Sequence, residues 1–137
     1  MIEQYGLNEL VRLHGSQPYE SIGDFYGKAD VFVLPTLGDY RALVGFEALS
    51  AGLPIIGSVF DGASSEIIED GVNGFIVDPR DEVSLTNKIQ AFLDNPEIAE
   101  EFGKESERIA KKYTVTVAAS NLIEAGKECI AELKFGK

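Results

Sequence analysis

The amino-acid sequence predicts an α/β fold: a Rossmann-like parallel sheet with helices on both faces and a helical C-terminal tail. Apolar runs alternate with helical patterns at intervals of about 20–25 residues, as in βα units. The run Val31-Phe32-Val33-Leu34 lacks polar alternation, which is typical of a strand buried on both faces. From Asp81 onward the pattern is helical to the end of the chain.

In the first part of the chain, residues 1–9 form a short polar, helix-like piece. The segment Val11–Gly15 alternates apolar and polar residues and predicts a short strand. After a turn at Gln17-Pro18, an amphipathic helix is expected over Tyr19–Ala29, and it leads into the apolar strand Val31–Leu34.

The next elements surround a helix that opens near Leu43 and is stopped by Gly52 and Pro54. The remaining expected elements are a strand over Ile55–Ser58, a short helix over Ser65–Glu69, a strand over Gly74–Val77, a helix ended by Asn95-Pro96, a polar helix over Glu97–Lys112 and a last helix from Val115. Cys129 lies on the apolar stripe of that last helix, so it is expected to be a buried core thiol.

Composition excludes several classes of function. The 137 residues are enough for one domain with a core, and the net charge of −11 disfavours nucleic acid and membrane-surface partners. Cys129 is the single cysteine, so no intrachain disulfide can form. No run reaches the roughly 18 apolar residues of a membrane span. The expected location is the cytoplasm.

Two acids, Asp39 and Glu47, bracket the opening of the helix that follows the most apolar strand. Ligands of parallel sheets bind beyond the carboxyl ends of the strands, where this loop lies. Backbone amides near Arg41, Ala42 and Leu43 would form a helix N-terminus, which favours an anion such as phosphate. A carboxylate at Glu47 can accept hydrogen bonds from vicinal hydroxyls. The residues alone favour a plainer alternative, in which Asp39 caps the helix and Glu47 is solvated.

The surrounding motifs resemble the retaining GT-B glycosyltransferases of group 1, the family 4-like set. That pattern is an acid, seven residues, Glu-Ala, then a small residue, Gly and Pro before a strand. Here it is read from Asp39 through Glu47-Ala48 to Gly52 and Pro54. Other segments that fit are Ala29 to Pro35, Gly62, Glu66-Ile67-Ile68, Gly71, Gly74, Val77-Asp78-Pro79, Leu93 to Glu97 and Tyr113, so the resemblance covers about residue 10 to the end.

The resemblance implies a role for each matching position. Glu47 is expected to contact the ribose hydroxyls, and Asp39 the transferred sugar. Amides near Ala42 and Leu43 are expected to contact the diphosphate. Gly62 and Glu66 would support the closing loop, and Ser16 and Gln17 would border the base. The implied reaction moves a sugar from a UDP- or GDP-sugar to a glycan or lipid-linked acceptor with retention, as in polysaccharide biosynthesis. No metal or other cofactor is expected.

Three positions depart from the family pattern. Asp39 stands where the family usually has Glu, which shortens the side chain by one methylene. Arg41-Ala42 replaces an aromatic residue followed by Gly, and Gly62-Ala63 replaces Gly-Gly. Arg41 is either a cation that approaches the donor phosphates or a surface residue paired with an acid. His14, the single histidine, is expected to be structural or solvent-facing.

The family's donor domain begins with a strand, a Gly-Arg loop, a Lys and a helix, and no such segment is found ahead of residue 10. We therefore expect residues 1–137 to be one partial nucleotide-sugar-binding domain, inactive alone and lacking its N-terminal acceptor domain. Open strand edges between Val11–Gly15 and Val31–Leu34 predict self-association. In the whole enzyme a location at the membrane periphery is compatible with the family.

Two alternatives remain open from the sequence. One is a non-catalytic, self-associating module that keeps the fold without the donor site, which the departures at Asp39 and the missing cations favour. The other is a flavodoxin-like binding or signalling domain. The lack of an acidic cluster at an early strand end and the long helical tail argue against the second alternative.

Overall fold

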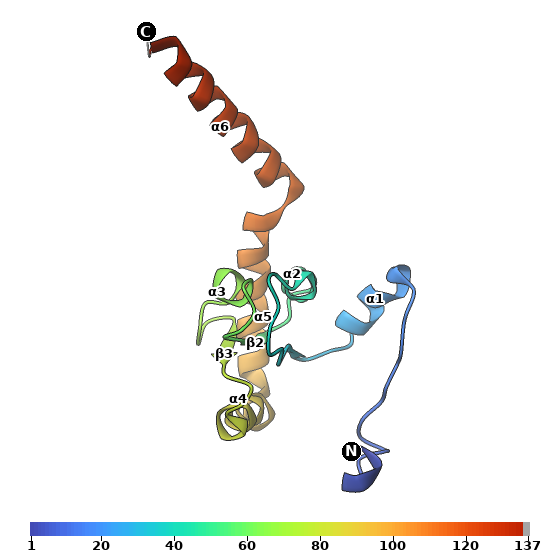
Figure 1. Ribbon diagram of the computed structural model, residues 1–137. Helices are drawn as coiled ribbons and strands as arrows, with labels where there is room; N and C mark the ends of the chain where they lie inside the picture. The colour runs from blue at the N-terminus through green and yellow to red at the C-terminus, as the bar shows by residue number, and fades with distance from the viewer. Residues whose placement is uncertain (136–137) are drawn as a thin grey trace.

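The computed structural model describes residues 1–135, so residues 136 and 137 of the expected domain lie outside the described part. Its centre is a sheet of three parallel strands in the order β1-β2-β3 (Figure 1). The strands are β1 (Phe32–Val33), β2 (Ile55–Ser58) and β3 (Gly74–Val77). Phe32 pairs with Ile55, and Ile55 pairs with Gly74. The predicted parallel sheet is confirmed.

Helices cover both faces of this sheet, as predicted. The α-helices are α1 (Tyr19–Tyr26), α2 (Leu43–Ser50), α3 (Ser64–Ile67), α4 (Glu82–Asp94), α5 (Pro96–Ala110) and α6 (Val115–Phe135), with 3-10 helices η1 (Glu3–Tyr5) and η2 (Lys111–Tyr113). Successive strand residues point to opposite faces. Ile55 therefore packs with Leu49 and Ile109 of α2 and α5, whereas Ile56 packs with Phe92 of α4.

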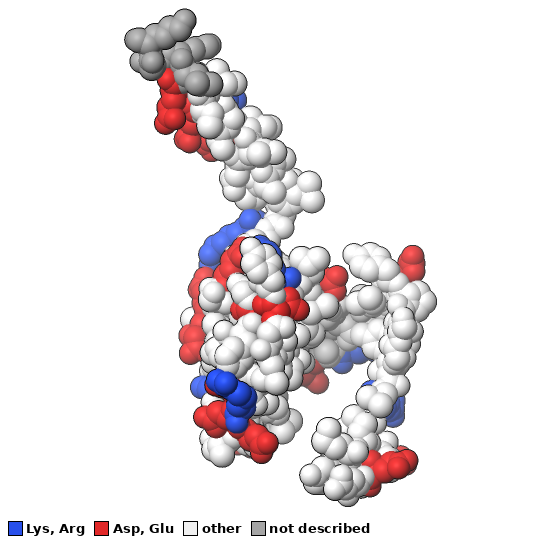
Figure 2. All heavy atoms as spheres, in the orientation of Figure 1, with Lys and Arg blue, Asp and Glu red and all other residues white. Residues whose placement is uncertain are grey.

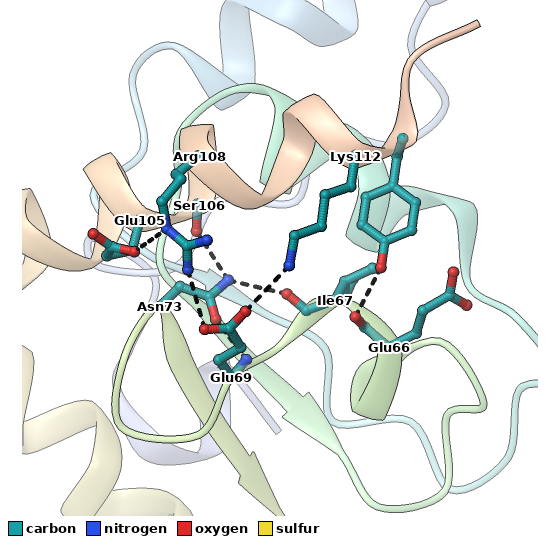
Figure 3. A network of polar contacts seen from close by, with 9 residues as sticks. Glu66, Ile67, Glu69, Asn73, Glu105, Ser106, Arg108 and Lys112 are labelled. Atoms are coloured by element: carbon teal, nitrogen blue, oxygen red, sulfur yellow. Dashed lines mark hydrogen bonds and ion pairs between the residues drawn. The ribbon is translucent and has the colours of Figure 1, made fainter. Parts of the chain in front are cut away.

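A buried polar network fixes α5 to the sheet (Figure 3). The Asn73 side chain is fully buried, and its Nδ2 donates to the carbonyl of Ile67 at 3.0 Å and to Ser106 Oγ at 3.3 Å. Its Oδ1 accepts the Glu69 amide at 2.7 Å. Ser106 Oγ in turn donates to the carbonyl of Leu53 at 2.7 Å. Asn73 thereby pairs with the backbone of Ile67 and Glu69, and Ser106 of α5 pairs with the backbone of Leu53. Buried backbone polar groups are satisfied in this way.

The prediction of a strand at Val11–Gly15 is wrong. This segment is exposed and pairs with no strand in residues 1–135, and Figure 1 shows it away from the sheet. An alternating pattern forms a strand only where a neighbour supplies the ladder of hydrogen bonds. The expected burial of Val31–Leu34 on both faces is also wrong, because β1 is an edge strand and Val33 is 36% exposed.

The helical tail is confirmed, but its expected burial is not. Helix α6 projects away from the body of the molecule (Figure 1). Leu122 is 76% exposed, Ile130 is 56% exposed, and the Cys129 thiol is exposed rather than buried. The apolar stripe has no partner element in the described chain to cover it. No helix in the described residues is both long enough and apolar enough to cross a bilayer.

Candidate functional site

The loops that follow β1 and β2 contact each other at the carboxyl edge of the sheet. The Asp39 amide donates to the Phe60 carbonyl at 3.1 Å, and the Gly62 amide donates to the Asp39 carbonyl at 3.1 Å. A Cβ on Gly62 would lie 2.1 Å from the Tyr40 carbonyl oxygen, so only glycine fits this approach. Gly62 therefore holds the loop of Asp39 against the loop after β2.

Replacing Gly62 with alanine is expected to lower the free energy of unfolding by about 1–2 kcal/mol, because the two loops must move apart. Gly38→Ala is the matched control, since a Cβ at Gly38 meets nothing within 4 Å. Urea unfolding of both variants measures the difference. Equal stability of the two variants would contradict the close approach of the loops.

Asp61 was not among the residues predicted from the sequence, yet it organises this edge. It is 4% exposed, and its Oδ1 accepts the amides of Ala42 at 3.0 Å and Ala63 at 3.2 Å. Its Oδ2 accepts the Ser64 hydroxyl at 2.8 Å. The buried carboxylate thus joins the start of α2 to the start of α3. An acid three residues after the β2 strand was the available signal, but its partners are set by tertiary contacts.

The amides at the start of α2 are only partly free. Arg41 N donates to Asp39 Oδ1 at 3.0 Å, and Ala42 N donates to Asp61. Ala42 is the N-cap residue and makes no side-chain cap, so the alternative in which Asp39 caps the helix is wrong. In the described part of the chain, the amides of Leu43 and Val44 have no acceptor. Unpaired amides at a helix N-terminus are donors that an anion can accept.

Arg41 lies beside two residues that fix its position. Its guanidinium forms a bidentate ion pair with Glu66, with Nη2 at 3.0 Å from Oε1, and lies 4.7 Å from the centre of the Phe46 ring. The hydrogen bond to Glu66 raises the pKa of Arg41. The Tyr113 hydroxyl donates to the Glu66 carbonyl at 2.9 Å. The structure therefore brings the predicted residues Arg41 and Glu66 together, with the cation paired to an acid.

Glu47 is half-buried on α2 and faces α1. Its Oε2 accepts the hydroxyl of Tyr26 at 2.9 Å. The carboxylate lines a cavity of ≈340 Å³ together with Tyr19, Glu20, Ile22, Gly23 and Tyr26. Burial, and then the hydrogen bond to Glu47, raise the pKa of Tyr26 to about 12. Glu47 is therefore an oriented acceptor at a cavity rather than a solvated helix residue.

The raised pKa of Tyr26 predicts a loss of stability in strong alkali. Because the folded value is about 12 and the ordinary value is 10.0, the contribution is complete below pH 10 and is lost as pH rises toward 12. The difference in unfolding free energy between the wild type and Tyr26→Phe should therefore be constant at neutral pH and shrink over that interval. A difference independent of pH would contradict the raised pKa of Tyr26.

The predicted base-side residues lie elsewhere. Gln17 precedes α1 and donates to the carbonyl of His14 at 2.5 Å. It lines a separate cavity of ≈480 Å³ with residues of α1 and of the segments on either side of that helix. His14 packs edge-on against Phe25 at 4.7 Å between ring centroids, as a structural residue does. Ser16 is exposed on the same segment. The structure therefore does not bring Ser16 and Gln17 to the cavity of Glu47.

Asp39 and Glu47 also line different cavities. Asp39 borders a hollow of ≈510 Å³ with Arg41, Asp61 and Gly62. The face shown in Figure 2 carries both signs of charge, and basic side chains gather where α5 meets α6. Within residues 1–135, no three His, Cys, Asp or Glu side chains are grouped as metal ligands.

Comparison with known proteins identifies a matching family and several relatives. Residues 1–109 match the family described as glycosyl transferases group 1. The D-inositol 3-phosphate glycosyltransferase of Streptomyces griseus is 29% identical over 115 residues, which are 84% of this chain and 24% of that protein. The chain thus spans about a quarter of the length of this curated relative, and 17% of a sucrose synthase from Thermosynechococcus vestitus that is 31% identical over 93% of this chain.

Solved structures show the same fold. A sucrose-phosphate synthase from Thermosynechococcus elongatus superposes with a TM-score of 0.81 and 27% identity, over 95% of this chain and 33% of that chain. HepE of Anabaena in complex with UDP superposes with a TM-score of 0.82 and 23% identity, over 93% of this chain and 35% of that chain. HepE has also been solved with UDP-glucose.

Proposed function

This chain belongs to the glycosyl transferases of group 1, and from that premise we propose that it is the donor-binding part of a retaining enzyme that uses a UDP- or GDP-sugar. One observation carries the proposal: a half-buried carboxylate, Glu47, is held at the wall of a cavity and keeps free acceptor capacity. Vicinal ribose hydroxyls are the donors that such a carboxylate suits. The complex of HepE with UDP supports the choice of nucleotide.

The other contacts of the donor are assigned on the same basis. The amides of Leu43 and Val44, rather than that of Ala42, would meet the diphosphate at the helix N-terminus. Asp39 would hold hydroxyls of the sugar in the adjoining hollow. Arg41 is paired with Glu66, so it would contact a phosphate only if that ion pair broke. These donors and charges support transfer without a metal ion.

The acceptor belongs to the rest of the enzyme. Because the chain spans 24% of the Streptomyces griseus relative and 17% of the Thermosynechococcus vestitus relative, we assign acceptor binding to another domain and expect residues 1–137 alone to be inactive. A glycan or a lipid-linked sugar is the proposed acceptor. The acidic composition and the lone cysteine support a cytoplasmic place of action.

A thermal-shift panel tests the proposal. UDP, GDP, ADP and the corresponding sugar nucleotides are added to the chain at concentrations up to millimolar. Because a ligand that binds only the folded state raises the melting temperature, one nucleotide should raise it, and the rise should grow with the logarithm of the nucleotide concentration above its Kd. An unchanged melting temperature with every nucleotide would contradict donor binding.

A second candidate, the non-catalytic self-associating module, is favoured by Asp61 and by the sheet edge. Asp61 already occupies the Ala42 amide, and β1 pairs only with β2 in the described residues. An open edge exposes backbone donors and acceptors that another strand can pair. Under either function we expect dimers or larger species in size-exclusion chromatography with light scattering. A monomer at high protein concentration would contradict pairing through this edge.

A further inference from the structure

We propose that Tyr26 is a positioning residue: its hydroxyl orients the Glu47 carboxylate so that this carboxylate distinguishes a ribonucleotide from its 2′-deoxy form. The inference rests on the proposed donor-binding function and gives α1, through Tyr26, a role in nucleotide binding. Tyr26 and Glu47 come from different helices, and the hydrogen bond between them spans 2.9 Å. No other side chain in the described residues donates to Glu47.

The position of the phenol is set by the core. The Tyr26 ring packs against Phe32 of β1, with 5.9 Å between the ring centroids, and both rings border the main apolar cluster. With the ring fixed, the hydroxyl is fixed too, because only a rotation about the C–O bond remains. The core thereby determines which oxygen of Glu47 is held and where the other oxygen lies along the cavity wall.

The chemistry of the pair suits a hydroxyl-bearing ligand. A carboxylate has about four acceptor sites, and the phenol uses one of them on Oε2. The pKa of Tyr26, raised from 10.0 to about 12, lies far above the neutral range, so the phenol is protonated there and donates to Glu47. The remaining sites can serve two vicinal hydroxyls. A ligand that lacks one hydroxyl leaves an oriented acceptor unpaired, which is the basis of discrimination.

The substitution Tyr26→Phe isolates this role. It keeps the ring that packs on Phe32 and removes only the oxygen bound to Glu47. Tyr113→Phe is the matched control, because the Tyr113 hydroxyl also makes one hydrogen bond at 2.9 Å, to the backbone carbonyl of Glu66. A change caused by a lost hydrogen bond in general appears in both variants. A change in binding that arises from the lost orientation of the Glu47 carboxylate appears in Tyr26→Phe alone.

Isothermal titration calorimetry of the chain with UDP, GDP and their 2′-deoxy forms tests the proposal. The wild type should bind the ribonucleotide about tenfold more tightly than the deoxy form, and Tyr26→Phe should reduce this ratio to about twofold, as expected for one hydrogen bond. Tyr113→Phe should keep the wild-type ratio. A wild-type ratio in Tyr26→Phe, or equal weakening of both forms, overturns the role of Tyr26. If the wild type binds no nucleotide, the donor-binding function itself fails and the inference falls with it.

Discussion

Replacing Glu47 with alanine is expected to weaken binding of UDP or GDP about 100-fold. The carboxylate is the only acidic side chain on α2, it is half-buried, and one oxygen is already held by Tyr26. Two hydrogen bonds from ribose hydroxyls to a charged acceptor contribute about 1.5 kcal/mol each or more. Each such contribution is about a tenfold change in affinity, so together they give about 100-fold. Calorimetry of the wild type and the variant with the same nucleotide measures it.

Glu20→Ala is the control for this experiment. Glu20 borders the same cavity and carries the same charge, but it is exposed and belongs to α1. Because a general electrostatic effect of removing one acid is shared by both variants, Glu20→Ala should change the affinity by less than about twofold. Equal losses in the two variants would show that Glu47 acts through net charge and does not contact the ligand.

Replacing Asn73 with alanine is expected to lower the free energy of unfolding by about 3 kcal/mol. The fully buried amide satisfies the Ile67 carbonyl, the Glu69 amide and the Ser106 hydroxyl. Alanine removes the side chain that pairs with these groups and leaves the Ile67 carbonyl and the Glu69 amide without these hydrogen bonds, each at a cost of about 1–3 kcal/mol. Urea unfolding followed by circular dichroism gives the change.

Asn87→Ala provides the comparison for Asn73. Asn87 is exposed on α4, so its replacement should alter the free energy of unfolding by no more than about 0.5 kcal/mol. The difference between the two variants then reports the buried network shown in Figure 3 and not the loss of an asparagine. A change below about 1 kcal/mol for Asn73→Ala would mean that water replaces the lost hydrogen bonds.

The sequence predicted the elements whose signals are local. Apolar runs located β2 and β3, and Gly52 with Pro54 marked the end of α2. Prediction from the sequence failed where a pattern forms its element, or becomes buried, only against a neighbouring element. The alternation at Val11–Gly15 is compatible with a strand, but no neighbouring strand completes it in the described chain. The stripe that includes Cys129 is compatible with burial, but Cys129, Leu122 and Ile130 are exposed.

The candidate site could be proposed from the sequence at the level of residue spacing. The acids Asp39 and Glu47 were singled out because the start of α2 lies between them and its end is marked by Gly52 and Pro54. Asp61 and Tyr26 were missed as parts of the site, because their roles are defined by contacts 19 and 21 residues away along the chain. A buried acid and an aromatic residue on a helix face have many possible partners. Only the packing of α1, α2 and the loop after β2 selects among them.

The start of α2 and Glu47 are together proposed to bind a nucleotide. Titration of UDP into the ¹⁵N-labelled chain, followed by amide chemical shifts, tests it most directly. The largest shifts should fall on Leu43, Val44 and Glu47, with smaller ones along the α1 face that borders the same cavity. Shifts confined to the separate cavity of Gln17, or no shifts at millimolar UDP and GDP, would contradict the claim.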